Sequence, residues 1–217
     1  MGSIGILLVK GTIDTLIMVL GSLLISYIIG LPLGVLLVVL KPNGLREHKG
    51  VYQVLSRFIN ILRSLPFIIL LTLLIPFTRF LVGTSIGILG MMVPLSIAAI
   101  PFVARMVEVS LSEVNPDLIA SMRVLGATPL TIIYQVYIGE SLPSLIRGVG
   151  ITFIALVGYS AMAGATGGGG LGDIAIRYGY YNYQFDIMIY TVLILIFIVE
   201  VAQYLANHIA NKWNHNK

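Results

Sequence analysis

The chain has 217 residues, of which 58% are hydrophobic and 10% are charged, with a net charge of +4 and a mean hydropathy of +0.99. Soluble domains usually carry about 25% charged residues, so this composition argues against a soluble enzyme and predicts an integral membrane protein. In such a protein the excess of Lys and Arg marks cytoplasmic loops, so no nucleic-acid partner is expected.

Five apolar runs follow one another along the chain, and a bilayer-spanning helix needs about 20 such residues. The runs are 15–40, 64–78, 85–104, 148–164 and 183–205. Prolines inside the runs, such as Pro32, Pro94 and Pro101, are tolerable because neighbouring helices can satisfy the freed backbone groups. We therefore predict a single all-α transmembrane domain over residues 1–217, with five transmembrane helices and its termini on opposite sides.

The positive charges are distributed unequally between the two sides. Of the thirteen Lys and Arg residues, ten lie in segments that share one side, at 41–63, at 105–147 and from 212 onward. The other side has only Lys10, Arg79 and Arg177. The positive-inside rule places 105–147 and the C-terminus in the cytoplasm, and the N-terminus outside.

The stretch DLIASMRVLGATPLTIIYQVY, at 117–137, is too broken to cross a bilayer. Asn115 and Pro116 suit the N-cap and first turn of a short helix, and Gly126 suits the left-handed position after its end. Thr128 and Pro129 suit the start of a second helix. The sequence therefore predicts a rigid corner between two short cytoplasmic helices, inside a loop at about 105–147.

The first of these helices is predicted to have one apolar face, because Leu118, Met122 and Leu125 are spaced at i, i+4 and i+7. In the second, Leu130, Ile133 and Tyr137 continue an apolar stripe. A helix this short is marginal alone in water and must dock on something. A helix lying on the lipid surface is one interpretation, but only Arg123 is available to rim its polar face, which favours docking on a protein partner.

Several stretches carry a resemblance to a known family. The corner resembles the coupling loop of ABC importer permeases, E-A-A-x-x-x-G followed after nine residues by I-x-L-P, with Gly126 in place but Ala120 for the Glu and Gly139 for the Pro. A wider set resembles the permease subunits of bacterial methionine uptake transporters. These stretches are GLPLGVLL (30–37), NILRSLPFIILL (60–71), IPFTRFLVGTSIG (75–87), PFVARMVE (101–108), LGATPLTII (125–133) and LVGYSAMAGATGGGGLG (156–172).

The resemblance implies a multi-pass protein of the bacterial cytoplasmic (inner) membrane. It implies a homodimer, two cytoplasmic ATPase subunits that bind ATP, and an extracytoplasmic lipoprotein that delivers methionine. The residues expected to couple to the ATPase are Asp117, Leu118, Ala120, Ser121, Met122, Arg123, Leu125, Gly126, Ala127, Thr128 and Pro129.

The sequence contains no recognisable motif for nucleotide binding, metal binding or catalysis. It has no phosphate-binding G-x-x-x-x-G-K-[ST] motif and no Gly-Lys pair, so ATP-driven work needs another subunit. There is no cysteine, and His48, His208 and His215 lack the spacing of metal ligands. We therefore predict no catalytic residue, no metal site and no cofactor in this chain.

Small residues in the fourth run indicate close packing of a helix, which has either a structural or a functional meaning. If this helix lines the translocation path, then Tyr159, Ser160 and Met162 are the candidates to face it. Near the fifth run, the stretch YGYYNY (178–183) is typical of an aromatic belt at the membrane interface. The alternative is that Tyr180, Tyr181 and Tyr183 contact the delivering binding protein.

Among charges inside the expected spans only Glu200 stands out, and the lack of an embedded charge pair argues against ion-coupled transport. Three alternatives stay open: the same machine with another amino acid as cargo, an ATP-independent secondary transporter or channel, and a membrane scaffold that moves nothing.

Overall fold

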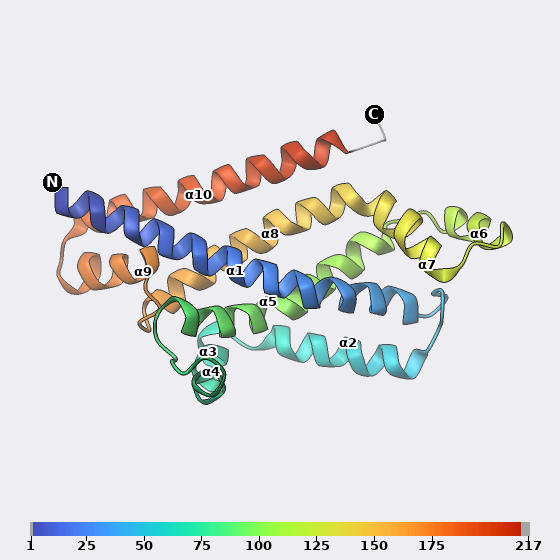
Figure 1. Ribbon diagram of the computed structural model, residues 1–217, viewed down its shortest axis with the longest axis horizontal. Coiled ribbons are helices and arrows are strands. Elements are labelled where there is room, and N and C mark those ends of the chain that lie inside the picture. The colour runs from blue at the N-terminus through green and yellow to red at the C-terminus, as the bar shows by residue number, and fades with distance from the viewer. Residues whose placement is uncertain (1, 214–217) are drawn as a thin grey trace.

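The computed structural model describes residues 2–213, and over this range the chain forms helices and connecting turns without a strand (Figure 1). His215, and Lys217 among the positive charges counted from 212 onward, lie outside the described residues. The elements are α1 (Gly2–Leu40), α2 (Lys49–Ser64), α3 (Phe67–Leu73), α4 (Ile75–Val82), α5 (Gly87–Ser112), α6 (Pro116–Val124), α7 (Pro129–Thr131), the π-helical η1 (Ile132–Ile138), α8 (Gly139–Gly164), α9 (Gly170–Ile174), the π-helical η2 (Ala175–Tyr181) and α10 (Phe185–Lys212).

Four of the described helices are long and apolar enough to cross a membrane: Ile4–Leu40, Gly87–Ser112, Pro129–Gly164 and Phe185–Lys212. A fifth crossing is available if α2 and α3 count as one span, bent by 100°. In Figure 1 the described chain starts at the left, with α1, and α10 ends toward the right. The all-α fold predicted from the sequence is confirmed.

The predicted run at 64–78 is not one helix. Proline disfavours helical backbone at the residue before it, and Leu65 accordingly adopts an extended conformation with φ −76° and ψ 126°. Pro66 is also extended, at ψ 132°, and the short helices α3 and α4 follow. The apolar residues of this run therefore form two short helices beside α5 rather than a straight span.

Three helices extend well beyond the predicted runs. The first begins at Gly2, α5 continues to Ser112, and the helix that ends at Gly164 starts at Pro129. The segment 105–147 thus consists of the ends of two long helices joined through α6. Pro143 is accommodated inside α8, where the neighbouring Ser141 hydroxyl donates to the Tyr137 carbonyl.

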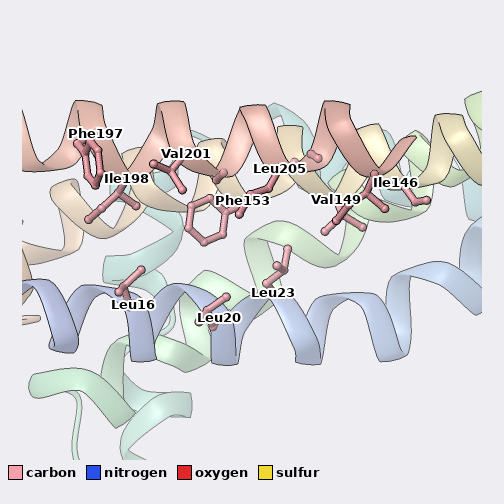
Figure 2. A pocket seen from close by; sticks show the side chains of 14 residues that line it. Leu16, Leu20, Leu23, Ile146, Val149, Phe153, Phe197, Ile198, Val201 and Leu205 are labelled. Carbon is pink, nitrogen blue, oxygen red and sulfur yellow. The ribbon is translucent and has the colours of Figure 1, made fainter. Parts of the chain in front are cut away.

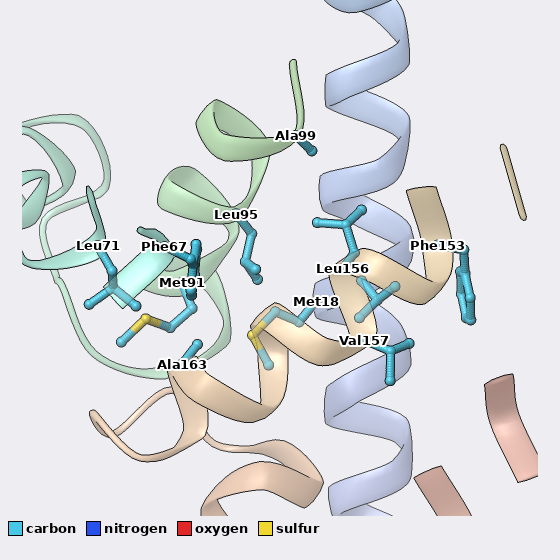
Figure 3. Close-up of a cluster of buried hydrophobic side chains, with 11 residues drawn as sticks. Met18, Phe67, Leu71, Met91, Leu95, Ala99, Phe153, Leu156, Val157 and Ala163 are labelled. Carbon is cyan, nitrogen blue, oxygen red and sulfur yellow. The ribbon is translucent and has the colours of Figure 1, made fainter. Parts of the chain in front are cut away.

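The core lies where α1, α5 and α8 meet. Met18, Met91, Leu95 and Leu156 are almost fully buried there (Figure 3). Nearer the other end of α1, Gly34 lets the backbones approach, because a Cβ atom at this position would lie 2.5 Å from the side chain of Val107. Helices α1 and α5 therefore form a tightly packed unit.

The last long helix, α10, is attached more loosely. Only 11% of its most apolar 18-residue stretch is buried. An apolar groove of about 630 Å³ separates α10 from α1 along much of its length (Figure 2). Its close approach to α8 is at Gly150, where an added Cβ would lie 2.6 Å from Cβ of Ala206.

Candidate functional site

The short helix α6 is closed at both ends by its own residues. At its start the Asn115 side chain accepts a hydrogen bond of 2.9 Å from the Asp117 N–H. At its end Gly126 has φ +79°, its N–H donates to the Arg123 carbonyl at 3.0 Å, and the Ala127 N–H donates to the Met122 carbonyl at 3.0 Å. These two bonds are the Schellman arrangement, so the predicted helix end at Gly126 is confirmed.

The chain turns at residues 126–128 and starts a new helix immediately. Thr128 caps it by accepting a hydrogen bond of 3.3 Å from the Thr131 N–H, and Pro129 occupies its first position. This helix is not the short one that was predicted. It continues through η1 into α8 and ends at Gly164, so that it is 36 residues long. The corner is therefore joined without a break to a membrane span.

The faces of α6 differ from those expected. Ile119 and Met122 pack against a buried cluster that includes Ile132 and Val136. Leu118 and Leu125 are exposed, at 44% and 79%, so the predicted stripe of Leu118, Met122 and Leu125 does not form one docking face. The packed face uses an i, i+3 pair instead, because α6 lies against the start of the long helix.

Five large apolar side chains of the corner are exposed, and they are here together called the tip patch. It consists of Leu118, Val124, Leu125, Leu130 and Tyr134, each between 44% and 88% exposed. Figure 1 places α6 and α7 at one extremity of the molecule. Exposed apolar patches of this kind mark interaction surfaces. Of the predicted coupling residues, most are exposed and two are half-buried, Met122 and Ala127.

A loop between α1 and α2 braces the corner from the side. The Arg123 guanidinium donates to the Gly44 carbonyl at 2.9 Å, and Lys41 Nζ donates to the Ser112 hydroxyl at 2.9 Å. Within the loop, the Asn43 N–H donates to Glu47 at 2.9 Å and, together with Lys49, lowers the pKa of that carboxyl group. Arg123 is therefore used to hold α6 in place within the chain.

The three candidates for a translocation path do not share one face of α8. Tyr159 stacks on Phe67, with ring centroids 4.8 Å apart, and Ser160 is buried, its hydroxyl donating to the Val157 carbonyl at 2.8 Å. Met162 alone of the three is exposed, at 51%. It continues an exposed strip of α8 that includes Ile151, at i−11.

The tyrosines of η2 and of the turn after it lie at the end of the molecule opposite the corner (Figure 1). Tyr180, Tyr181 and Tyr183 are 62%, 67% and 90% exposed, and the first two rings meet edge to face at 5.4 Å. Tyr183 has a positive φ of 56°, which a non-glycine residue seldom adopts. Their exposure is compatible with both the interfacial belt and the partner contact that were predicted.

One partly buried polar network was missed by sequence reasoning. Arg105 pairs with Glu108 on α5 and donates to Ser56 at 3.0 Å and to Asn60 at 2.7 Å on α2. Glu108 also accepts a hydrogen bond of 3.0 Å from Tyr52. The i, i+3 spacing of the pair was its sequence signal, but both residues lie past the end of the expected run at 85–104.

Possible metal ligands do not cluster in the described part of the chain. Among residues 2–213 there is no group of three or more His, Cys, Asp or Glu side chains placed to hold a metal ion. Glu200, the charge singled out in the sequence, lies exposed on α10.

Comparison with known proteins gives matches along nearly the whole chain. A family model described as the binding-protein-dependent transport system inner membrane component matches residues 30–215. The chain is 44% identical over 209 residues to the probable D-methionine transport system permease protein MetI of Vibrio cholerae, covering 96% of this chain and 93% of that protein. It is 51% identical over 158 residues to the D-methionine transport system permease protein MetI of Salmonella typhimurium, covering 73% of each.

Solved structures give the same fold. A chain of the MetNI methionine ABC transporter in an inward-facing conformation superimposes with a TM-score of 0.94 at 45% identity, covering 95% of this chain and 96% of that one. A chain of an amino acid ABC transporter crystallised with histidines has a TM-score of 0.77 at 22% identity, with 95% and 94% covered, a likeness of fold alone.

Proposed function

Because the chain belongs to the family of binding-protein-dependent transport system inner membrane components, we propose that it is the permease subunit of an ATP-driven importer that carries methionine across the bacterial inner membrane. The observation that carries this proposal is the agreement of sequence and fold with methionine transport permeases over 95% of the chain. The identity of the transported amino acid is inferred from those relatives. The way in which the ATPase drives the chain is inferred from the corner of this chain.

The chain works as one part of a larger assembly. A second copy of itself completes the membrane domain, two cytoplasmic ATPase subunits supply the energy, and an extracytoplasmic binding protein delivers the cargo. The sequence has no phosphate-binding loop, so ATP binds to the partner subunits and this chain is not the enzyme. The corner faces the cytoplasm, in keeping with the positive charges around it.

The corner at residues 117–129 transmits the motion of the ATPase. Its tip patch offers the partner an exposed apolar contact, while Ile119 and Met122 hold α6 against the long helix behind it. Since that helix runs on to Gly164, a displacement of the corner moves the inner end of a 36-residue lever. The paired permeases then alternate between inward-open and outward-open states, with the energy supplied from outside the chain.

The path for the cargo lies between the two copies. The exposed strip of α8 lines it, with Met162 near its outer end, and the flexible thioether suits contact with a passing methionine side chain. At the outer face, Tyr180, Tyr181 and Tyr183 receive the binding protein, since exposed tyrosines are favoured at protein contacts.

Reconstitution tests the proposal. The chain is placed in proteoliposomes with its ATPase and binding protein, and the uptake of labelled methionine is measured against a panel of other labelled amino acids. We expect uptake that needs ATP, prefers methionine and survives an ionophore. If this chain alone concentrated methionine, or if the ionophore abolished uptake, the protein would be a secondary transporter. If uptake preferred another amino acid, the chain would still be an importer permease, but its cargo would not be methionine.

A further inference from the structure

The two edges of α2 differ sharply in polarity. At 100° per residue, Gln53, Arg57 and Asn60 share one edge of this helix, here called the polar edge. Val54, Phe58 and Ile61 share the other, here called the apolar edge, where they are 72%, 58% and 57% exposed. All three residues of the polar edge are exposed as well. A helix that faced lipid all round would not carry such an edge.

Contacts with the rest of the protein fix the rotation of α2. Ile59, between the two edges, is buried with Leu37 of α1 and Ala104 of α5, and Leu55 packs against the same cluster. On the other side Arg105 donates to Ser56 and Asn60. The polar edge therefore adjoins the charged pair of α5, and the apolar edge points away from it.

The position of α2 along the molecule decides what the polar edge meets. Figure 1 shows α2 running antiparallel beside the last turns of α1, on the border of the protomer away from α10. Together with α3 it has the length and hydropathy of a bent span. An arginine facing hydrocarbon there costs about 2.5–3.5 kcal/mol, so an exposed Arg57 requires water or a polar partner at that edge.

An importer of amino acids needs such a surface. A free amino acid carries an ammonium and a carboxylate group, and neither crosses an apolar path without losing its hydration. The exposed strip of α8 supplies Ile151, Gly158 and Met162, which offer no side-chain partner for either charge. The polar groups must come from another element.

We propose that the polar edge of α2, with Arg105 and Glu108 behind it, is one wall of the water-filled inner half of the translocation path and contacts the charged ends of the cargo. This assignment rests on the proposed function of the chain as an amino-acid permease. The apolar edge faces lipid, and the Arg105–Glu108 pair keeps the helix rotated so that Asn60 stays on the aqueous side.

The chain contains no cysteine, so single cysteines report on each edge without a background. We would make Gln53→Cys, Arg57→Cys and Asn60→Cys on the polar edge, and Val54→Cys, Phe58→Cys and Ile61→Cys as matched controls interleaved on the same helix. Each permease, assembled with its ATPase and binding protein in proteoliposomes, is treated with a membrane-impermeant methanethiosulfonate that reaches the cytoplasmic side. Gln53→Cys leaves the bonds of Arg105 intact, which keeps the test independent of that network.

Reaction of a thiol needs the hydrated thiolate, so we expect the polar edge to be labelled at least about tenfold faster than the apolar edge in the nucleotide-free state. Trapping the ATP-bound state should slow that labelling, and labelled polar-edge variants should lose most of their uptake. Equal labelling of both edges would overturn the assignment. Labelling that leaves uptake unchanged, or that requires removal of the ATPase, would also overturn it and place the edge at a subunit contact. The labelling needs no particular cargo. A failure of methionine uptake would therefore contradict the proposed function, whereas the labelling pattern would still test the role of α2.

Discussion

The two ends of the molecule are built differently, although each contains a sharp turn next to a π-helical segment. At the end that we propose faces the cytoplasm, here called the inner end, the turn uses a glycine at its left-handed position, Gly126, and capping bonds close both helices that it joins. At the outer end the left-handed position is held by a tyrosine, Tyr183, which is 90% exposed. The inner turn suits the transmission of force, and the outer turn suits contact with a partner that binds and leaves.

The largest expected effect comes from breaking the inner turn. Gly126→Val with Pro129→Gly places a β-branched residue at φ +79° and removes the fixed start of the long helix. Strain of about 1–3 kcal/mol should loosen the corner and lower methionine uptake at least about tenfold while ATP hydrolysis persists, or else prevent ATPase assembly. Uptake and hydrolysis are measured in the same vesicles.

Gly83→Val is the matched control for this experiment. Gly83 has φ +77° and, like Gly126, open space around an added Cβ, but it ends α4 rather than the corner. It should carry the same local strain and leave transport coupled. Full coupled uptake by the corner variant, or equal losses at both glycines, would count strongly against a special role for the inner turn.

A smaller effect is expected at the outer end. Replacing Tyr180, Tyr181 and Tyr183 with Ala removes three exposed rings, and interface tyrosines often contribute more than about 1 kcal/mol each. The ATPase rate stimulated by the binding protein should therefore fall about fivefold or more, with the basal rate unchanged. Tyr190→Ala with Tyr204→Ala, at exposed positions of α10, serves as the control. Equal losses in both variants would favour a membrane belt.

The brace of the corner should matter less than the turn itself. Arg123→Ala removes the part-buried bond to the Gly44 carbonyl, and a hydrogen bond from a charged donor contributes about 1.5 kcal/mol at the low end. We expect the methionine carried per ATP hydrolysed to fall by a few fold. Arg46→Ala, in the loop that braces the corner, removes the same charge. If it had the same effect, then net charge rather than the bond to Gly44 would be responsible.

The smallest effect is expected at Met162. Because its side chain is exposed on α8 and flexible, Met162→Ala should change uptake about twofold, or alter its coupling to ATP, without lowering expression. Uptake measured at several methionine concentrations checks this. Identical curves for the variant and the unaltered permease would remove Met162 from the path.

Local signals in the sequence were sufficient to predict the caps and the turn of the corner. Caps and turns depend on a few neighbouring residues, so Asn115, Gly126, Thr128 and Pro129 could be placed without a structure. The resemblance to methionine transport permeases is confirmed by the family match and by the curated relatives.

Features that depend on packing between distant segments were not predicted. The end of α5 at Ser112 and the long start of α8 follow from contacts that continue their helices past the apolar runs. The side of α6 that is buried is set by Ile132 and Val136, which lie beyond the turn. The pairing of Arg105 with α2 joins residues 45 and 49 positions apart, which periodicity within one helix does not reveal.

The central claim is that the corner passes motion from the ATPase to the outer half of the membrane domain. It is tested most directly by two spin-label distances across the permease dimer, one between Leu125→Cys at the corner and one between Ala165→Cys just past the outer end of the same long helix. Upon ATP trapping we expect both distances to change together, and the Gly126→Val, Pro129→Gly variant to keep at most the change at the corner. An outer distance that changes equally in that variant would show that the force takes another route.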